Sequence, residues 1–258
     1  MDLTPIIVIG AGMVVVAVAF IVFARYKGGP WRYMALGALL WAATIIVKQL
    51  LSTVLEPTVY GALYVPDKLW ASGSVLFYVY VGLLTGATEV FLTWLLLRYT
   101  RLGRIPWTKV LAFGIGFGSI EALYLGFTYL VTLIPAISDP NSIPESALKN
   151  LQTFSSPLLS VPIVVERIGS ILAHIFCSAL LFYSVISGKV RWMFVSFAFK
   201  SLLDAVVGFA YFWGTQTIFK LWTIEAIILL FGCAAWWGTL KIQRRYAGSY
   251  VSQPTIKI

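Results

Sequence analysis

The sequence predicts an all-α membrane protein of about seven transmembrane helices, and three observations lead to that prediction. First, 60% of its 258 residues are hydrophobic and only 11% are charged, whereas soluble domains have about 45–50% apolar and about 25% charged residues. Second, several apolar runs reach the ~20 residues that a helix needs to cross a ~30 Å hydrocarbon core. Third, short basic clusters separate these runs, as is typical of multi-pass membrane proteins. Spans and short connections use nearly the whole chain, so we expect one transmembrane domain over residues 1–258.

Three apolar runs predict the first three spans. Residues 6–24 end at a basic, glycine-containing segment, and residues 34–54 end where Glu56 and Pro57 predict a loop. Residues 75–97 form the third run, which ends in an arginine-rich segment. The residues before the first run lack the basic stretch that opens a signal peptide, so we expect this run to be retained as a helix.

Four further apolar runs complete the predicted bundle. They are residues 110–133, 158–186, 193–213 and 218–240. A polar loop with several prolines, residues 135–157, is expected after the fourth span, and a basic tail, residues 241–258, after the seventh.

Basic residues are distributed unevenly between the two sides of the predicted bundle. One side carries thirteen of them: Arg25, Lys27, Arg32, Arg98, Arg101, Arg104, Lys109, Lys189, Arg191, Lys241, Arg244, Arg245 and Lys257. The other side carries Lys68 and Lys149. Because cytoplasmic loops are enriched in Lys and Arg, we predict an outside N-terminus and a cytoplasmic C-terminus in the plasma membrane. This distribution makes the lipid bilayer, and not a nucleic acid, the expected partner of the net charge of +9.

Ionisable residues inside the spans are the candidates for a functional site. Such a residue near a helix centre costs about 2.5–3.5 kcal/mol on insertion scales, so it usually faces the bundle interior and is paired. Nine acidic or basic residues and the only histidine lie in or near the spans: Lys48, Glu89, Glu121, Glu166, Arg167, His174, Lys200, Asp204, Lys220 and Glu225. Lys220, and to a lesser extent Arg167, can reach an interface by extending the side chain, and Lys48 only in part.

Six of these residues form the predicted core set on the third to sixth spans. They are Glu89, Glu121, Glu166, His174, Lys200 and Asp204. Lys200 and Asp204 are one helical turn apart and can pair on one face. Glu166 and His174 are eight residues apart, which places them within roughly 80° of each other around a helix. The set predicts a polar intramembrane chamber, although mutual neutralisation that only fixes helix packing is the alternative.

A run of small residues precedes Glu121. Gly114, Gly116, Gly118 and Ser119 occupy four of six consecutive positions inside an apolar span. This pattern predicts a smooth helix surface for close packing. A phosphate-binding glycine loop would need a preceding strand, and the apolar context argues against one.

The order of these motifs resembles that of the YhfC-type intramembrane metalloproteases, relatives of the CAAX-processing and bacteriocin-processing membrane proteases, over residues 75–208. The resemblance implies four helix motifs: Gly-x-x-Glu-Glu-x-x-Arg, then Gly-x-Gly-His-Gly-Gly-x-Glu-Ala, then Glu-Arg followed by a His, then His-x-x-x-Asp. The corresponding stretches of this chain are residues 86–93, 114–122, 166–174 and 200–204.

The chain departs from these motifs at four positions. Val90 replaces the second motif Glu, Thr93 the Arg, Phe117 the first His and Lys200 the last His. The retained residues are Glu89, Glu121, Glu166, Arg167, His174 and Asp204. The resemblance implies Glu89, Glu121 and His174 as catalytic residues of an active enzyme. It makes zinc a possible cofactor, with His174, Glu121 and Asp204 as ligands, because a catalytic zinc takes three protein ligands and a water.

We therefore expect a catalytically degenerate family member that needs no cofactor. In this hypothesis Lys200 neutralises the carboxylates, and the network of Glu166, Arg167, Lys200 and Asp204 binds a membrane partner or a small ligand. The first alternative is an active intramembrane protease with an atypical site, acting on a membrane protein or peptide. The second is an ion- or proton-coupled transporter, although the sequence has no internal repeat of the kind common in transporters.

Overall fold

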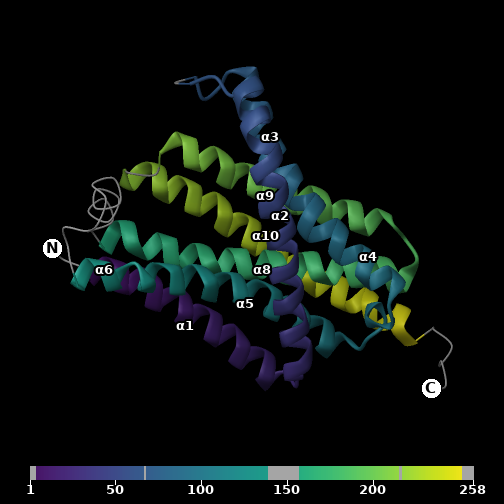
Figure 1. Cartoon of the computed structure of the whole chain (residues 1–258). Helices are drawn as coiled ribbons and strands as arrows, with labels where there is room; N and C mark the ends of the chain where they lie inside the picture. Colours follow the sequence, from purple (N-terminus) through teal and green to yellow (C-terminus); the bar gives the residue numbers. More distant parts are fainter. Residues whose placement is uncertain (1–3, 67, 139–156, 215–216, 252–258) are drawn as a thin grey trace.

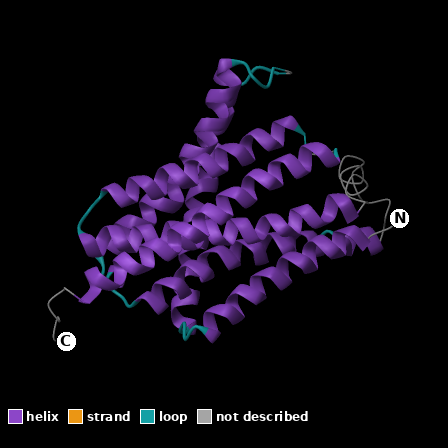
Figure 2. Cartoon of the chain, turned by 180° about the vertical axis from the view of Figure 1, so that it is seen from behind, coloured by secondary structure: helices purple, strands orange, loops and turns teal. Residues whose placement is uncertain are grey.

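The structure is a computed structural model that describes residues 4–66, 68–138, 157–214 and 217–251. Within these residues every regular element is helical (Figures 1 and 2). The elements are α1 (Thr4–Tyr26), α2 (Trp31–Leu63), α3 (Ser72–Thr85), η1 (Gly86–Phe91), α4 (Leu92–Tyr99), η2 (Arg101–Gly103), α5 (Trp107–Val131), α6 (Leu133–Ser138), α8 (Pro157–Ser187), α9 (Arg191–Trp213) and α10 (Ile218–Val251).

The predicted fold class is confirmed. Seven helical stretches of the described chain are long and apolar enough to cross a membrane, and they coincide with the seven predicted runs. The third stretch is continuous through α3, η1 and α4 and runs from Ser72 to Tyr99. The two chain termini lie at opposite ends of the bundle (Figure 1), as an odd number of spans requires.

Two of the predicted helices were too short at their C-terminal ends. α2 continues to Leu63, so Glu56 and Pro57 lie inside a helix and not in a loop. The Ser52 hydroxyl donates a hydrogen bond to the Glu56 carboxylate one turn away, which partly satisfies the acid within the helix. α10 continues to Val251, so much of the predicted tail is helical.

The predicted loop over residues 135–157 also begins in helical structure, because α6 extends to Ser138. The remainder of that loop lies outside the described residues. The charges that we assigned to the outer side include Lys149, which falls in that undescribed part, as does Lys257 of the opposite set.

Helix α8 forms the centre of the bundle. Of its most apolar window, 89% is buried inside the protein, against 28% for α1. It packs against α10, α5, α9 and α1, and the two views show it running between the other long helices (Figures 1 and 2). Charged residues on α8 are therefore held in the protein interior and away from lipid.

The glycine run lets α5 pack closely on two of its neighbours, α8 and α2. A Cβ atom on Gly118 would lie 3.0 Å from the Ile171 Cα atom of α8, and one on Gly116 would meet the backbone of Met34 on α2. The prediction of a smooth, closely packed helix surface is confirmed. This close approach brings Glu121, one turn after Phe117, next to α8.

Candidate functional site

Glu89 is positioned by a local change of helix type. Residues Gly86–Phe91 form a π-helix, η1, between α3 and α4, and such turns occur frequently at functional sites. A Cβ atom on Gly86 would overlap the Ser201 hydroxyl of α9, so glycine is needed for η1 to approach α9 this closely. The Glu89 side chain is consequently buried, with 5% of the residue exposed.

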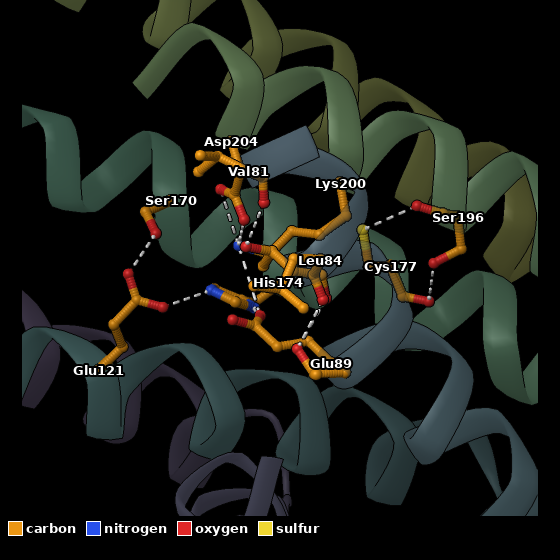
Figure 3. A network of polar contacts seen from close by, with 12 residues as sticks. Val81, Leu84, Glu89, Glu121, Ser170, His174, Cys177, Ser196, Lys200 and Asp204 are labelled. Carbon is orange, nitrogen blue, oxygen red and sulfur yellow. Dashed lines mark hydrogen bonds and ion pairs between the residues drawn. The ribbon is translucent and has the colours of Figure 1, made fainter. Parts of the chain in front are cut away.

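Lys200 lies between two carboxylates. Its Nζ atom donates a hydrogen bond to Asp204 Oδ1 at 3.1 Å and lies 3.4 Å from Glu89 Oε2 (Figure 3). Lys200 is only 4% exposed. Reciprocal hydrogen bonds between Cys177 of α8 and Ser196 of α9 hold the two helices in register beside it. The ammonium group is thus fixed between η1 and α9 in a region with little access to water.

Glu121 is a second point, after Lys200, at which several charged groups meet. Its Oε2 atom lies 2.8 Å from His174 Nε2, and its Oε1 atom accepts hydrogen bonds from Arg167 Nη1 at 3.0 Å and Ser170 Oγ at 3.3 Å. Figure 3 shows the Glu121 carboxylate pointing from α5 to His174 and Ser170 on α8. Arg167 also donates to the neighbouring Glu166 carboxylate.

His174 lies between the charges around Lys200 and the charges around Glu121. Its Nδ1 atom lies 3.9 Å from Glu89 Oε2, on the opposite edge of the ring from Glu121. The structure therefore brings every candidate site residue into one polar network: Glu89, Glu121, Glu166, Arg167, His174, Lys200 and Asp204. Four helical elements supply these residues, namely η1, α5, α8 and α9. Buried charges that are paired in this way are the arrangement in which a membrane interior tolerates them.

Arg167 agrees with its assignment to the polar network and not with an extension toward an interface. It is buried and pairs with two glutamates. The physical reason is that α8 is enclosed by other helices, so a carboxylate is nearer than any aqueous surface.

Sequence reasoning missed two neighbours of the network. Ser170 lies one turn before His174 and one turn after Glu166, so helical spacing alone could have identified it. Glu225 on α10 was counted as ionisable but left out of the core set; it is 2% exposed, and its Oε2 atom has no hydrogen-bond partner among the described residues. Its location on the last span gave no indication that α10 packs against the charged face of α8.

A cavity of about 270 Å³ lies on one side of the network. Six of the network residues line it, all except His174, together with residues of α2, α3, α5, α8, α9 and α10. The other lining residues are Trp41, Ile45, Lys48, Val81, Thr85, Tyr124, Leu125, Ser170, Leu203, Val207 and Ile228. We refer to this space as the chamber. It combines paired charges with apolar walls, as small-molecule sites commonly do.

A much smaller space lies beside His174. This hollow has a volume of about 10 Å³ and is lined by Glu89, Val90, Thr93, Phe117, His174, Cys177, Ser178, Leu181 and Lys200. The Phe117 ring packs on the imidazole of His174, with 5.2 Å between ring centroids. All four positions at which the chain departs from the family motifs, Val90, Thr93, Phe117 and Lys200, therefore border the hollow.

The site does not fit a zinc ion. Within the described part of the chain, no group of three His, Cys, Asp or Glu side chains has the arrangement to hold a metal. His174 is the only histidine, and the Lys200 ammonium already lies between Glu89 and Asp204. A second cation beside that ammonium would be repelled, because unit charges a few ångströms apart interact strongly in a medium of low dielectric constant.

Comparison with models of known protein families gives a match over most of the chain. No curated protein and no solved structure is significantly similar to the chain. The family model described as YhfC intramembrane metalloprotease matches residues 12–228. This match extends from α1 into α10 and so reaches beyond the residues 75–208 that carry the motifs. The seven membrane-spanning helices, the order of the charged motifs and a match over most of the sequence lead to one conclusion: the chain belongs to the YhfC intramembrane metalloprotease family.

Proposed function

We propose that this chain is a family member that works without zinc and binds a small ligand or a membrane segment in the chamber. The Lys200 ammonium provides the positive charge that balances Glu89 and Asp204. The observation that carries the proposal is the position of its Nζ atom, 3.1 Å from Asp204 Oδ1 and 3.4 Å from Glu89 Oε2.

The two spaces beside His174 support a binding role. A water molecule needs about 10–15 Å³ of accessible volume, so the hollow of about 10 Å³ has space for roughly one water and none for a scissile peptide bond. The chamber of about 270 Å³ is close to the lower end of the roughly 300–1,000 Å³ typical of ligand pockets. His174 does not line it. The imidazole therefore borders the smaller of these two spaces and not the larger one.

The proposal includes a plasma-membrane location with the N-terminus outside and the C-terminus in the cytoplasm. It is supported by basic residues at the ends of α1 and α4, at the start of α9 and in the last third of α10, all of which fall on one side of the bundle in an odd-span arrangement. In this orientation they face the cytoplasm.

Metal analysis of the purified protein tests the absence of zinc. We expect the unmodified protein to contain less than about 0.1 zinc per chain, because its ligand set is incomplete. The variant with Phe117→His and Lys200→His regains two imidazoles beside His174, so we expect it to bind zinc, and His174→Ala in that background to release it. Stoichiometric zinc in the unmodified protein that disappears on His174→Ala would overturn the proposal.

One observation favours the alternative of an active protease with an atypical site. Glu121, His174 and Glu89 form a carboxylate–imidazole–carboxylate series with contacts of 2.8 and 3.9 Å, which is an arrangement that can accept and return a proton. A working enzyme would cleave membrane-embedded peptides in a reconstituted assay. Glu89→Gln and His174→Ala would both abolish that cleavage, whereas a protein that only binds its ligand would show no cleavage in any form.

A further inference from the structure

The charges that line the chamber are paired, with one exception. Glu89 and Asp204 share Lys200, and Glu121 and Glu166 share Arg167. Lys48 of α2 also lines the chamber, is half-buried, and has no ion pair or hydrogen bond among the described residues. The four carboxylates of the chamber thus share two cations, and the third cation, Lys48, contacts no carboxylate among the described residues.

The position of Lys48 along α2 makes this exception significant. Lys48 lies sixteen residues after Arg32, the basic residue at the start of the helix, which corresponds to about 24 Å at 1.5 Å per residue. Because α2 crosses the other long helices at a steep angle (Figure 1), this length along the helix is not a depth, but it places Lys48 well inside the membrane-spanning helix. A lysine at this position can reach the interface only in part, so a negatively charged partner would stabilise it.

The rim of the chamber faces lipid. Val207 of α9 is 42% exposed and Tyr124 of α5 is 59% exposed, and both line the chamber. On α2, Val47 beside Lys48 is exposed as well. These residues are apolar or aromatic, and in a membrane protein such an exposed surface contacts lipid acyl chains. A ligand would therefore enter sideways from the bilayer.

We propose that the chamber binds an anionic amphiphile from the bilayer, with its acidic group paired to Lys48 and its apolar chain passing the rim at Val207. The inference rests on the ligand-binding role proposed above and names the chemical class of the ligand. A fatty-acid carboxylate and a phospholipid phosphate both meet this description. The apolar side chain of Ile45, one turn before Lys48, gives the first carbons of the chain a contact inside the chamber.

Binding measurements on the purified full-length protein test this inference. Native mass spectrometry would count bound phosphatidylglycerol and phosphatidylcholine, a fluorescent long-chain fatty acid would be titrated separately, and inorganic phosphate would serve as an anion without a chain. We expect the phospholipid with net negative charge, the fatty acid or both to bind, and phosphatidylcholine and phosphate to bind at least tenfold more weakly. Binding of phosphatidylglycerol would identify a phosphate as the acidic group, and binding of the fatty acid would identify a carboxylate.

Three variants assign the binding to the chamber. Lys48→Gln should weaken the anionic ligand about tenfold, which corresponds to the loss of one charge-assisted hydrogen bond, whereas Lys48→Arg should retain it. Lys27→Gln removes an exposed lysine at the end of α1 and controls for surface charge. Val207→Trp, which fills the rim, should block the ligand altogether.

The outcomes separate this inference from the proposed function. Binding that Val207→Trp blocks but that Lys48→Gln leaves unchanged would overturn the anionic ligand and preserve a ligand-binding chamber. Equal losses in Lys48→Gln and Lys27→Gln would assign the effect to surface charge and overturn the inference. Binding of every amphiphile that is insensitive to Val207→Trp would overturn both the inference and the proposed use of the chamber.

Discussion

The hollow and the chamber both border the charged network and share Glu89 and Lys200, but they differ in size and in the rest of their lining. The hollow has about 10 Å³ of space and is bordered by the four residues that depart from the family motifs. The chamber has about 270 Å³ and is bordered by most of the retained charges. The departures are therefore concentrated at one place in three dimensions, although they come from η1, α4, α5 and α9 in the sequence. Substitutions that leave little space in the hollow and keep the charges around the chamber are consistent with loss of a proteolytic role and retention of a binding role.

Lys200 borders both the hollow and the chamber, so replacing it should lower the stability of the protein more than any other single substitution around these two spaces. Lys200→Ala leaves Glu89 and Asp204 buried without their shared cation. Breaking a buried ion pair by removing one partner costs about 3–5 kcal/mol. We expect a correspondingly large fall in the thermal unfolding temperature of the protein in detergent.

A matched control and a compensating variant identify the cause of that fall. Lys220→Ala removes a lysine near the start of α10 that donates only to the Trp213 carbonyl oxygen, and it should have a small effect. Adding Glu89→Gln and Asp204→Asn to the Lys200 variant removes the uncompensated charges and should recover part of the lost stability. If the triple variant is as unstable as Lys200→Ala alone, the lysine acts through packing and not as a counter-ion.

The sequence could predict the spans and the members of the network but not how space is divided around it. Hydropathy and helical period are properties of neighbouring residues, so the seven spans could be found locally. Charges such as Glu121 and Asp204 could be identified because they are rare in apolar runs and must find partners. The π-helix at Glu89 depends on how closely Gly86 approaches α9, which is a property of the packed bundle.

The same limit explains the remaining differences. Whether Phe117 points to His174 or to lipid, and whether Lys48 faces the chamber or an interface, depends on the rotation and tilt of each helix. Two apolar helix faces have nearly equal affinity for lipid and for one another, because no hydrophobic driving force distinguishes them. The hydrophobic pattern therefore does not determine these rotations. The burial of Arg167 and Glu225 by α8 and α10 is a consequence of the same packing.

Gly118 tests whether the tight contact between α5 and α8 keeps the hollow closed. A Cβ atom at this position would lie 3.0 Å from Ile171 Cα and 3.1 Å from His174 Cβ, so Gly118→Ala requires the two helices to separate slightly. Overpacking of this kind costs about 1–3 kcal/mol, and we expect a fall in unfolding temperature to match. Gly61→Ala is the control, because a Cβ there meets no described atom within 4 Å and alanine has the higher helix propensity. Equal effects of the two substitutions would show that the contact is not tight in solution.

Glu225 provides the smallest and most discriminating test, because it is a buried glutamate near the charges of the chamber that lacks an ion pair among the described residues. Its Oε2 atom has no hydrogen-bond partner, whereas Glu121 contacts both Arg167 and His174. Glutamine has nearly the same shape as glutamic acid and avoids any cost of desolvating a charged carboxylate, so Glu225→Gln should leave the free energy of unfolding unchanged or raise it by less than about 1 kcal/mol. Glu121→Gln should lower it by about 1.5–3 kcal/mol, since it weakens hydrogen bonds to charged groups. Chemical unfolding of the two variants side by side measures this difference. If Glu225→Gln destabilises the protein as much as Glu121→Gln does, the Glu225 carboxyl group interacts with the network. The network then includes a residue that does not line the chamber.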